Sequence, residues 1–180
     1  MNKKKAIILA AMAVILVGVG TTLAILSAIS GSVTTDFVIG DIEISLEETT
    51  GREYQLIPGT TVKKDPTVTV IADSEDCWLF IRVEKTQGFD DYVSYSIADG
   101  WLNLTSVDGV FYRVVEKSET DMKFPILSND EISVRDVVTK EVLASVSVNP
   151  NMTFSTYAVQ MEGVDTALTA WNLILKEMEE

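Results

Sequence analysis

The sequence has no histidine and a single cysteine, Cys77, among its 180 residues. Without an imidazole, neither a serine–histidine nor a cysteine–histidine nucleophilic system can be assembled. Zinc hydrolases of the HExxH type are excluded as well, since their metal is held by histidine ligands. Glycine-rich phosphate loops are absent, and no motif singles out a glycosidase pair among the 27 acidic residues. We therefore expect a protein that is not an enzyme and has no catalytic residues and no cofactor.

Charge is absent from one long stretch. Residues 6–35 carry no charged side chain, and they follow three lysines at positions 3–5. A basic opening followed by an apolar run is typical of an export signal. The alternative is a permanent membrane span over residues 6–28, which are apolar enough to cross a bilayer as a helix.

Two positions fit the small-residue rule for signal cleavage. One lies between Ala24 and Ile25, which makes residues 1–24 the signal, and the other lies between Ala28 and Ile29. Glycines and threonines just before the first position disfavour a helix there, and a signal peptidase needs extended chain. We expect cleavage, preferably after Ala24.

Basic residues are scarce: 14 stand against 27 acidic ones in the whole chain, a net charge of −13. Such a charge repels nucleic acid and anionic membrane surfaces. Acidic groups at 73–76 and 90–91 lack the spacing of a calcium loop, so we expect no metal site. One cysteine allows no disulfide within the chain, which in an exported protein fits a Gram-positive type of compartment.

Short runs of apolar and β-branched residues, bounded by turn signals, follow one another along the chain. The expected strands are 36–46, 61–71, 77–84, 92–97, 101–105, 110–115, 122–127, 132–138, 142–148 and 153–161. This pattern, without long helices between the strands, predicts an all-β fold, an antiparallel jelly-roll-like β-sandwich. No repeat or linker divides residues 36–180, so we expect a single domain there.

The run 77–84 is the most apolar stretch after the signal and predicts a central strand, with Trp78 and Phe80 in the core. Near the C-terminus the period changes to that of a helix. We expect this helix over about 164–178, with Asp165 as its N-cap and Trp171 packed on the sandwich.

Several stretches, taken together in their order and spacing, resemble the TasA/camelysin family of secreted Gram-positive proteins, whose signal is processed by a SipW-type peptidase. They are the lysine opening with 18–24 (GVGTTLA), 32–42 (SVTTDFVIGDI), 56–60 (LIPGT), 64–68 (KDPTV), and 157–165 with 170–171. The chain departs from the family at 25–27, where Ile-Leu-Ser replaces aromatic and polar residues.

The resemblance implies a jelly-roll-like domain that is exported and assembled into extracellular fibres of a biofilm matrix. Fibre subunits of this kind can be joined when the N-terminal segment of one chain adds as a strand to its neighbour. Some relatives are described as proteases, but a chain without histidine gives that activity no support.

Residues 25–35 supply a physical basis for such an assembly, because cleavage would turn them into an uncharged tail that tolerates a β conformation. A strand added to an open sheet edge gains a row of backbone hydrogen bonds, and its alternate side chains fill pockets. The candidate donor-strand residues are Ile25, Leu26, Ile29 and Val33.

We therefore expect a secreted structural protein, found in the extracellular matrix or at the cell surface of a Gram-positive-type bacterium. Its partners would be copies of itself, other matrix proteins, and a signal peptidase during export, with membrane contact only through the uncleaved N-terminal segment. The alternatives are a membrane-anchored adhesion module that retains residues 6–28 and, further off, a carboxylate-based hydrolase or protease.

The N-terminus of the exported form separates the first two hypotheses. Intact mass and N-terminal sequencing of the protein from the culture medium are expected to show a start at Ile25 or Ile29. A full-length chain confined to the membrane fraction would instead favour the anchored module.

Overall fold

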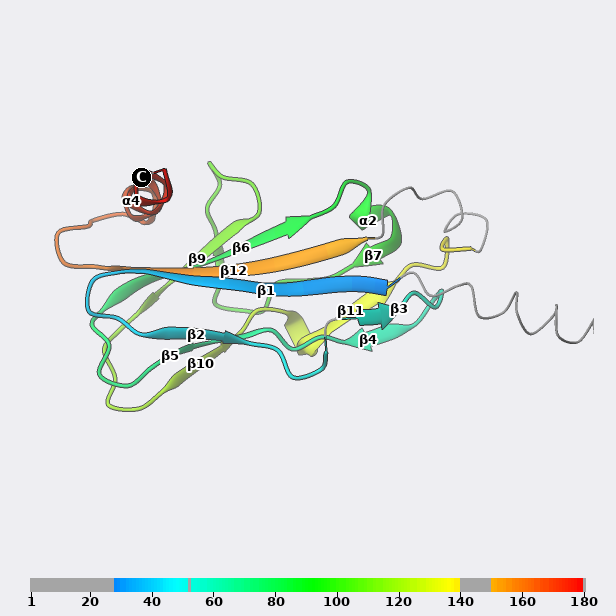
Figure 1. Ribbon diagram of the computed structural model, residues 1–180, viewed down its shortest axis with the longest axis horizontal. Coiled ribbons are helices and arrows are strands. Elements are labelled where there is room, and N and C mark those ends of the chain that lie inside the picture. Colours follow the sequence, from blue (N-terminus) through cyan, green and yellow to red (C-terminus); the bar gives the residue numbers. More distant parts are fainter. Residues whose placement is uncertain (1–27, 52, 140–149, 180) are drawn as a thin grey trace, which may run out of the picture.

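The computed structural model describes residues 28–51, 53–139 and 150–179. Strands are the main regular secondary structure of these residues, and their one helix of several turns lies at the C-terminal end (Figure 1). The prediction of a β-rich domain with a short C-terminal helix is thus confirmed. None of the helices within these ranges is long and apolar enough to cross a membrane.

The strands have these bounds: β1 (Ala28–Ile39), β2 (Ile44–Glu47), β3 (Glu53–Gln55), β4 (Thr61–Lys63), β5 (Thr67–Val70), β6 (Cys77–Lys85), β7 (Val93–Ser94), β8 (Leu102–Asn103), β9 (Val110–Val115), β10 (Met122–Pro125), β11 (Glu131–Val134) and β12 (Asn151–Gln160). The helical elements are α2 (Phe89–Tyr92), the 3-10 turn η1 (Ser128–Asp130) and α4 (Ala167–Met178). The expected strand at 142–148 lies outside the described residues.

These strands form three sheets. A six-stranded sheet has the order β3-β1-β12-β6-β9-β8, and two three-stranded sheets have the orders β10-β5-β2 and β4-β11-β7. The named strands that the structure describes pair antiparallel except β1 and β12, which run parallel. The expectation of a wholly antiparallel arrangement is wrong at this one pair. Parallel neighbours need a long crossover connection, and here nearly the whole domain forms it.

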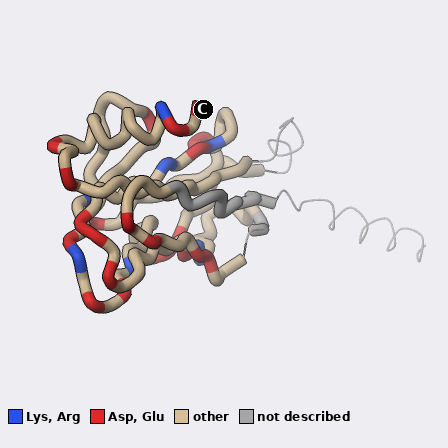
Figure 2. The backbone as a smooth tube through the Cα atoms, turned by 60° about the vertical axis from the view of Figure 1, so that its left-hand side comes forward, with Lys and Arg blue, Asp and Glu red and all other residues tan. Residues whose placement is uncertain are grey.

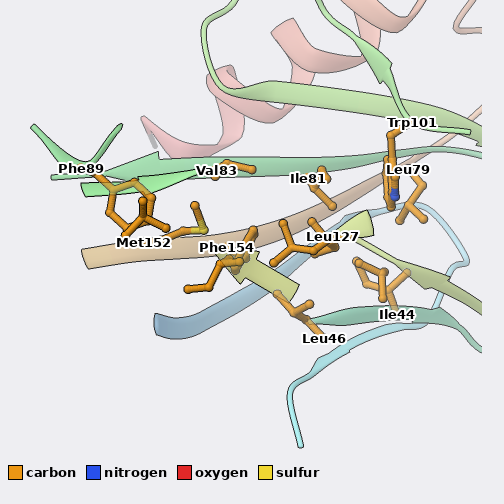
Figure 3. Close-up of a cluster of buried hydrophobic side chains, with 14 of the residues drawn as sticks. Ile44, Leu46, Leu79, Ile81, Val83, Phe89, Trp101, Leu127, Met152 and Phe154 are labelled. Carbon is orange, nitrogen blue, oxygen red and sulfur yellow. The ribbon is translucent and has the colours of Figure 1, made fainter. Parts of the chain in front are cut away.

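The main core lies between the six-stranded sheet and the smaller sheets. Figure 3 shows side chains from β6 and β12 on one side of this core and from β2 on the other. Fully or nearly fully buried members include Ile44, Leu46, Val68, Val70, Leu79, Ile81, Ile132, Met152 and Phe154. Because alternate residues of a strand point to opposite faces, each sheet gives one row of apolar side chains to this layer.

A second core lies on the other face of the six-stranded sheet, under α4 (Figure 1). Phe80 of β6 is fully buried there, and its ring centroid lies 5.4 Å from that of Trp171, which is 1% exposed. Trp78 is only partly buried, and its Nε1 donates a hydrogen bond of 2.9 Å to the Val164 carbonyl. The strand β6, between β12 and β9, thus contributes to both cores.

The helix α4 begins at Ala167, three residues later than expected. Its N-cap is Thr166, whose hydroxyl oxygen accepts a hydrogen bond from the Thr169 N–H at 3.2 Å, so the prediction of Asp165 as cap is wrong. Threonine and aspartate are both good caps, and the sequence pattern alone could not separate two adjacent candidates.

Two predicted strands are each divided in the structure. The segment 36–46 breaks at Gly40, whose φ of 110° suits glycine and where a Cβ would meet the Gln160 side chain at 2.6 Å. After this turn the chain leaves the six-stranded sheet and continues as β2 in another sheet. The segment 61–71 divides into β4 and β5 around Pro66, which has no N–H to give to a ladder.

The burial of Phe80 gives a direct test of the second core. We expect Phe80→Ala to lower the free energy of unfolding by about 3–5 kcal/mol in denaturant melts, because it leaves a cavity beside Trp171. Val114→Ala, at a position 47% exposed on the neighbouring strand β9, is the control and should change it by about 0.5 kcal/mol or less. Equal effects at the two positions would contradict this packing.

Candidate functional site

The segment expected to be a free tail is, from residue 28 onward, a strand of its own chain's sheet. Ile29 pairs with Tyr54 of β3, and Val33 pairs with Phe154 of β12. Ile25 and Leu26 lie outside the described residues. The candidate donor segment is therefore not an exposed tail where the structure describes it, because its uncharged, β-tolerant sequence finds two strand partners within the same chain.

An irregularity divides β1 into two halves. The parallel register with β12 runs over 30–33, shifts between Val33 and Asp36, and resumes over 36–39. Residues 28–30 also pair with β3, which is three residues long and forms the edge of the sheet. We call residues 28–33 the N-terminal half of β1. Its departure would open a gap between β3 and β12.

A buried ion pair lies next to this half. The side chains of Glu48 and Lys64 are 1% and 0% exposed, and Lys64 Nζ lies 2.7 Å from Glu48 Oε1. The Tyr54 hydroxyl donates to the same carboxylate oxygen at 2.5 Å and also lies within hydrogen-bonding reach of the Gly51 carbonyl. Burial, together with the Glu48 hydrogen bond, raises the pKa of Tyr54 well above its usual range, so the phenol remains a donor.

The position of the ammonium is fixed by two aromatic rings. Lys64 Nζ lies 5.1 Å from the ring centroid of Tyr54 and 5.5 Å from that of Phe154, both within cation–π range. Tyr54 belongs to β3 and Phe154 to β12, the two strands that flank β1. The charged end of Lys64 therefore lies between the two neighbours of the N-terminal half.

Asp65 holds the loop that carries Glu48. Its carboxylate accepts hydrogen bonds of 2.9 Å from the backbone N–H groups of both Thr49 and Thr50, and it also accepts from both hydroxyls. Burial acts to raise the pKa of Asp65, but these four hydrogen bonds outweigh it and hold the pKa well below the usual range. Pro66 directly precedes β5. Three consecutive residues thus have three roles: Lys64 is buried, Asp65 holds the loop after Glu48, and Pro66 leads into the strand.

The other candidate groups are already engaged or inaccessible. Asp90 pairs with Lys85 at 2.7 Å, and Glu75 pairs with Lys117 at 2.6 Å, so both acidic loop tips carry ion pairs. Burial and then the charge of Asp76 raise the pKa of the Cys77 thiol to about 12, which keeps it protonated. Within the described ranges no cluster of three potential metal ligands occurs. Acidic residues outnumber basic ones along the backbone (Figure 2).

Residues 64–68 belong to the expected strand 61–71 and to the family resemblance, but no pattern in the sequence singled out Glu48, Lys64 or Tyr54 as a site. A lysine between a strand of alternating pattern and a proline carries no signal of burial, because lysine is mostly exposed in proteins. Neither a family model nor a curated protein matches the chain. The contacts of Glu48, Lys64 and Tyr54 are therefore the basis for assigning this site a role.

The role of Asp65 gives a pH-dependent test. Asp65→Ala should lower the unfolding free energy at neutral pH by about 1–3 kcal/mol, because the Thr49 and Thr50 N–H groups lose a charged acceptor. The folded-state pKa is lowered, so this stabilisation is present above the usual aspartate pKa of about 4 and is lost as the pH falls below it.

Denaturant melts from neutral pH down to about pH 2 check this expectation, since the gap between the Asp65→Ala variant and the unsubstituted protein should close on acidification. Glu116→Ala, at an exposed position on the surface, is the matched control and should show no such closing gap. A difference for Asp65→Ala that stays constant with pH would contradict the role of the carboxylate.

Proposed function

We propose that the protein is a secreted structural subunit that builds extracellular fibres or matrix by strand addition between its own copies. The observation that carries the proposal is the position of the N-terminal half of β1, which lies in the interior of a sheet yet belongs to the segment next to the expected cleavage sites. The uncharged run 6–35 and the acidic remainder of the chain support export and solubility outside the cell.

The proposed exchange conserves the backbone hydrogen bonds of the sheet. If the N-terminal half of one copy leaves the gap between β3 and β12, the same residues of a second copy can enter it in the same register. Each incoming strand then restores the bonds that were lost, as in other cases of strand addition. Repetition of this step in one direction generates an open chain of subunits, because the contact is head-to-tail.

A jelly-roll-like sandwich is the fold that we propose for this subunit. Its support is the single core shared by the six-stranded sheet and the strands of β10-β5-β2 and β4-β11-β7. The irregularity between Val33 and Asp36 supports a release limited to the N-terminal half, since residues 36–39 keep a separate stretch of register with β12. The domain would then keep its second core during exchange.

The second candidate function is an anchored binding or adhesion module that retains residues 6–28. Its support is the length of the uncharged apolar run. In that case the N-terminal half of β1 would connect the anchor to the domain and would stay in its own sheet.

Removal of residues 25–35 tests the proposal. The shortened protein is expected to fold to a monomer that does not polymerise, because it has an open gap and no strand to donate. Added synthetic peptide of residues 25–35 should bind this monomer with 1:1 stoichiometry, measured by calorimetry. A peptide of the same composition in scrambled order is the control and should not bind.

Light scattering and electron microscopy of the unshortened protein and of the 25–35 deletion, under the same conditions, complete the comparison. Fibres that grow equally well from both would rule out strand addition by this segment.

A further inference from the structure

We infer that the buried Glu48–Lys64 pair makes the N-terminal half of β1 easier to release from its own sheet, and so controls how readily the strand is exchanged. The inference rests on the proposed function for its biological meaning, but its first test needs no fibres. It assigns a role to two residues whose burial is otherwise costly to the fold.

The pair is incompletely satisfied where it lies. Lys64 carries three N–H donors, and within the described part of the chain its ammonium makes one hydrogen bond, to Glu48 Oε1. Glu48 Oε2 is buried and has no hydrogen-bond partner among the described residues. The attraction between two buried ions offsets their loss of hydration only when further hydrogen bonds satisfy both groups. Because this pair lacks the full set of such bonds among the described residues, contact with water would stabilise both ions.

The N-terminal half of β1 lies between the two strands whose aromatic rings contact Lys64. Lys64 Nζ contacts rings on β3 and β12, and the register sets these two rings opposite positions 29 and 33 of β1. The residue midway between those positions is Gly31, which brings no side chain to this part of the sheet. Loss of the strand would therefore open the sheet directly beside the ammonium.

Buried apolar residues also flank the chain segment that supplies Glu48 and Tyr54. Leu46 of β2 precedes Glu48 and Leu56 follows β3, which carries Tyr54, and the two leucines are 8% and 3% exposed. The Asp65 hydrogen bonds to Thr49 and Thr50 hold the loop after Glu48 and involve no residue of β1. On this inference, release of β1 would hydrate the pair without unfolding of the whole domain.

An apolar replacement of the pair tests the inference. The double variant Glu48→Leu/Lys64→Met keeps the approximate volume of both side chains and removes both charges. Tyr54 retains an acceptor in the Gly51 carbonyl. Hydrogen exchange of the exported protein, followed by mass spectrometry, should show amides of residues 28–33 exchanging at least tenfold more slowly than in the unsubstituted protein, with β6 and β9 unchanged.

A second ion pair on the surface provides the matched control. Lys117 Nζ lies 2.6 Å from Glu75 Oε1, but the two side chains are 49% and 38% exposed. The double variant Glu75→Leu/Lys117→Met should leave exchange in β1 unchanged. Exchange in β1 that is as fast in Glu48→Leu/Lys64→Met as in the unsubstituted protein, with β6 still protected, would overturn the inference.

A single variant covers the case in which the double variant fails to fold. Glu48→Gln leaves the Lys64 ammonium buried without a counter-charge, so it should accelerate exchange of residues 28–33 at least tenfold relative to β6. An unchanged rate there would also overturn the inference.

Fibre growth then distinguishes this inference from the proposed function. Slower exchange in β1 together with slower growth supports both. Slower exchange in a protein whose fibres grow at the unsubstituted rate, or that forms no fibres at all, would retain the role of the pair and reject strand addition as the joining step.

Discussion

The parallel pairing of β1 with β12 is the contact on which the rest of the molecule depends. It joins the first and last described strands of the domain, and it completes the six-stranded sheet by linking β3 to the strands that carry both cores. The main core and the α4 core both use side chains of β12, at Phe154 and Tyr157 respectively. Without this contact, β1 and β3 would no longer be part of the six-stranded sheet.

The sheet also shows how one strand can serve two layers. In β6, Leu79 and Ile81 enter the main core while Phe80 enters the core under α4, and all three are fully buried. Next to β1, this apolar structure also holds a buried ion pair, where Glu48, Lys64 and Tyr54 meet. The pair therefore sets this part of the sheet apart from the two apolar cores.

Much of the fold could be predicted from residue patterns. The bounds of β9 agree with the expected 110–115, and β6 differs from the expected 77–84 by one residue, because both are apolar runs bounded by turn signals. The partner of β1 could not be predicted, since a parallel pairing across the whole domain leaves no local signal. The site was missed for a similar reason: Lys64 and Glu48 are ordinary surface residue types, and only the tertiary structure buries them.

The pairing of β1 with β12 has a consequence for the order in which the domain can fold. Ser30 pairs with Asn151, so the central sheet cannot close until the C-terminal part of the domain is available. Contacts between residues so distant in sequence form slowly, because a long loop must be closed first. If the chain is exported as proposed, its central sheet would therefore stay open during synthesis until β12 has been made.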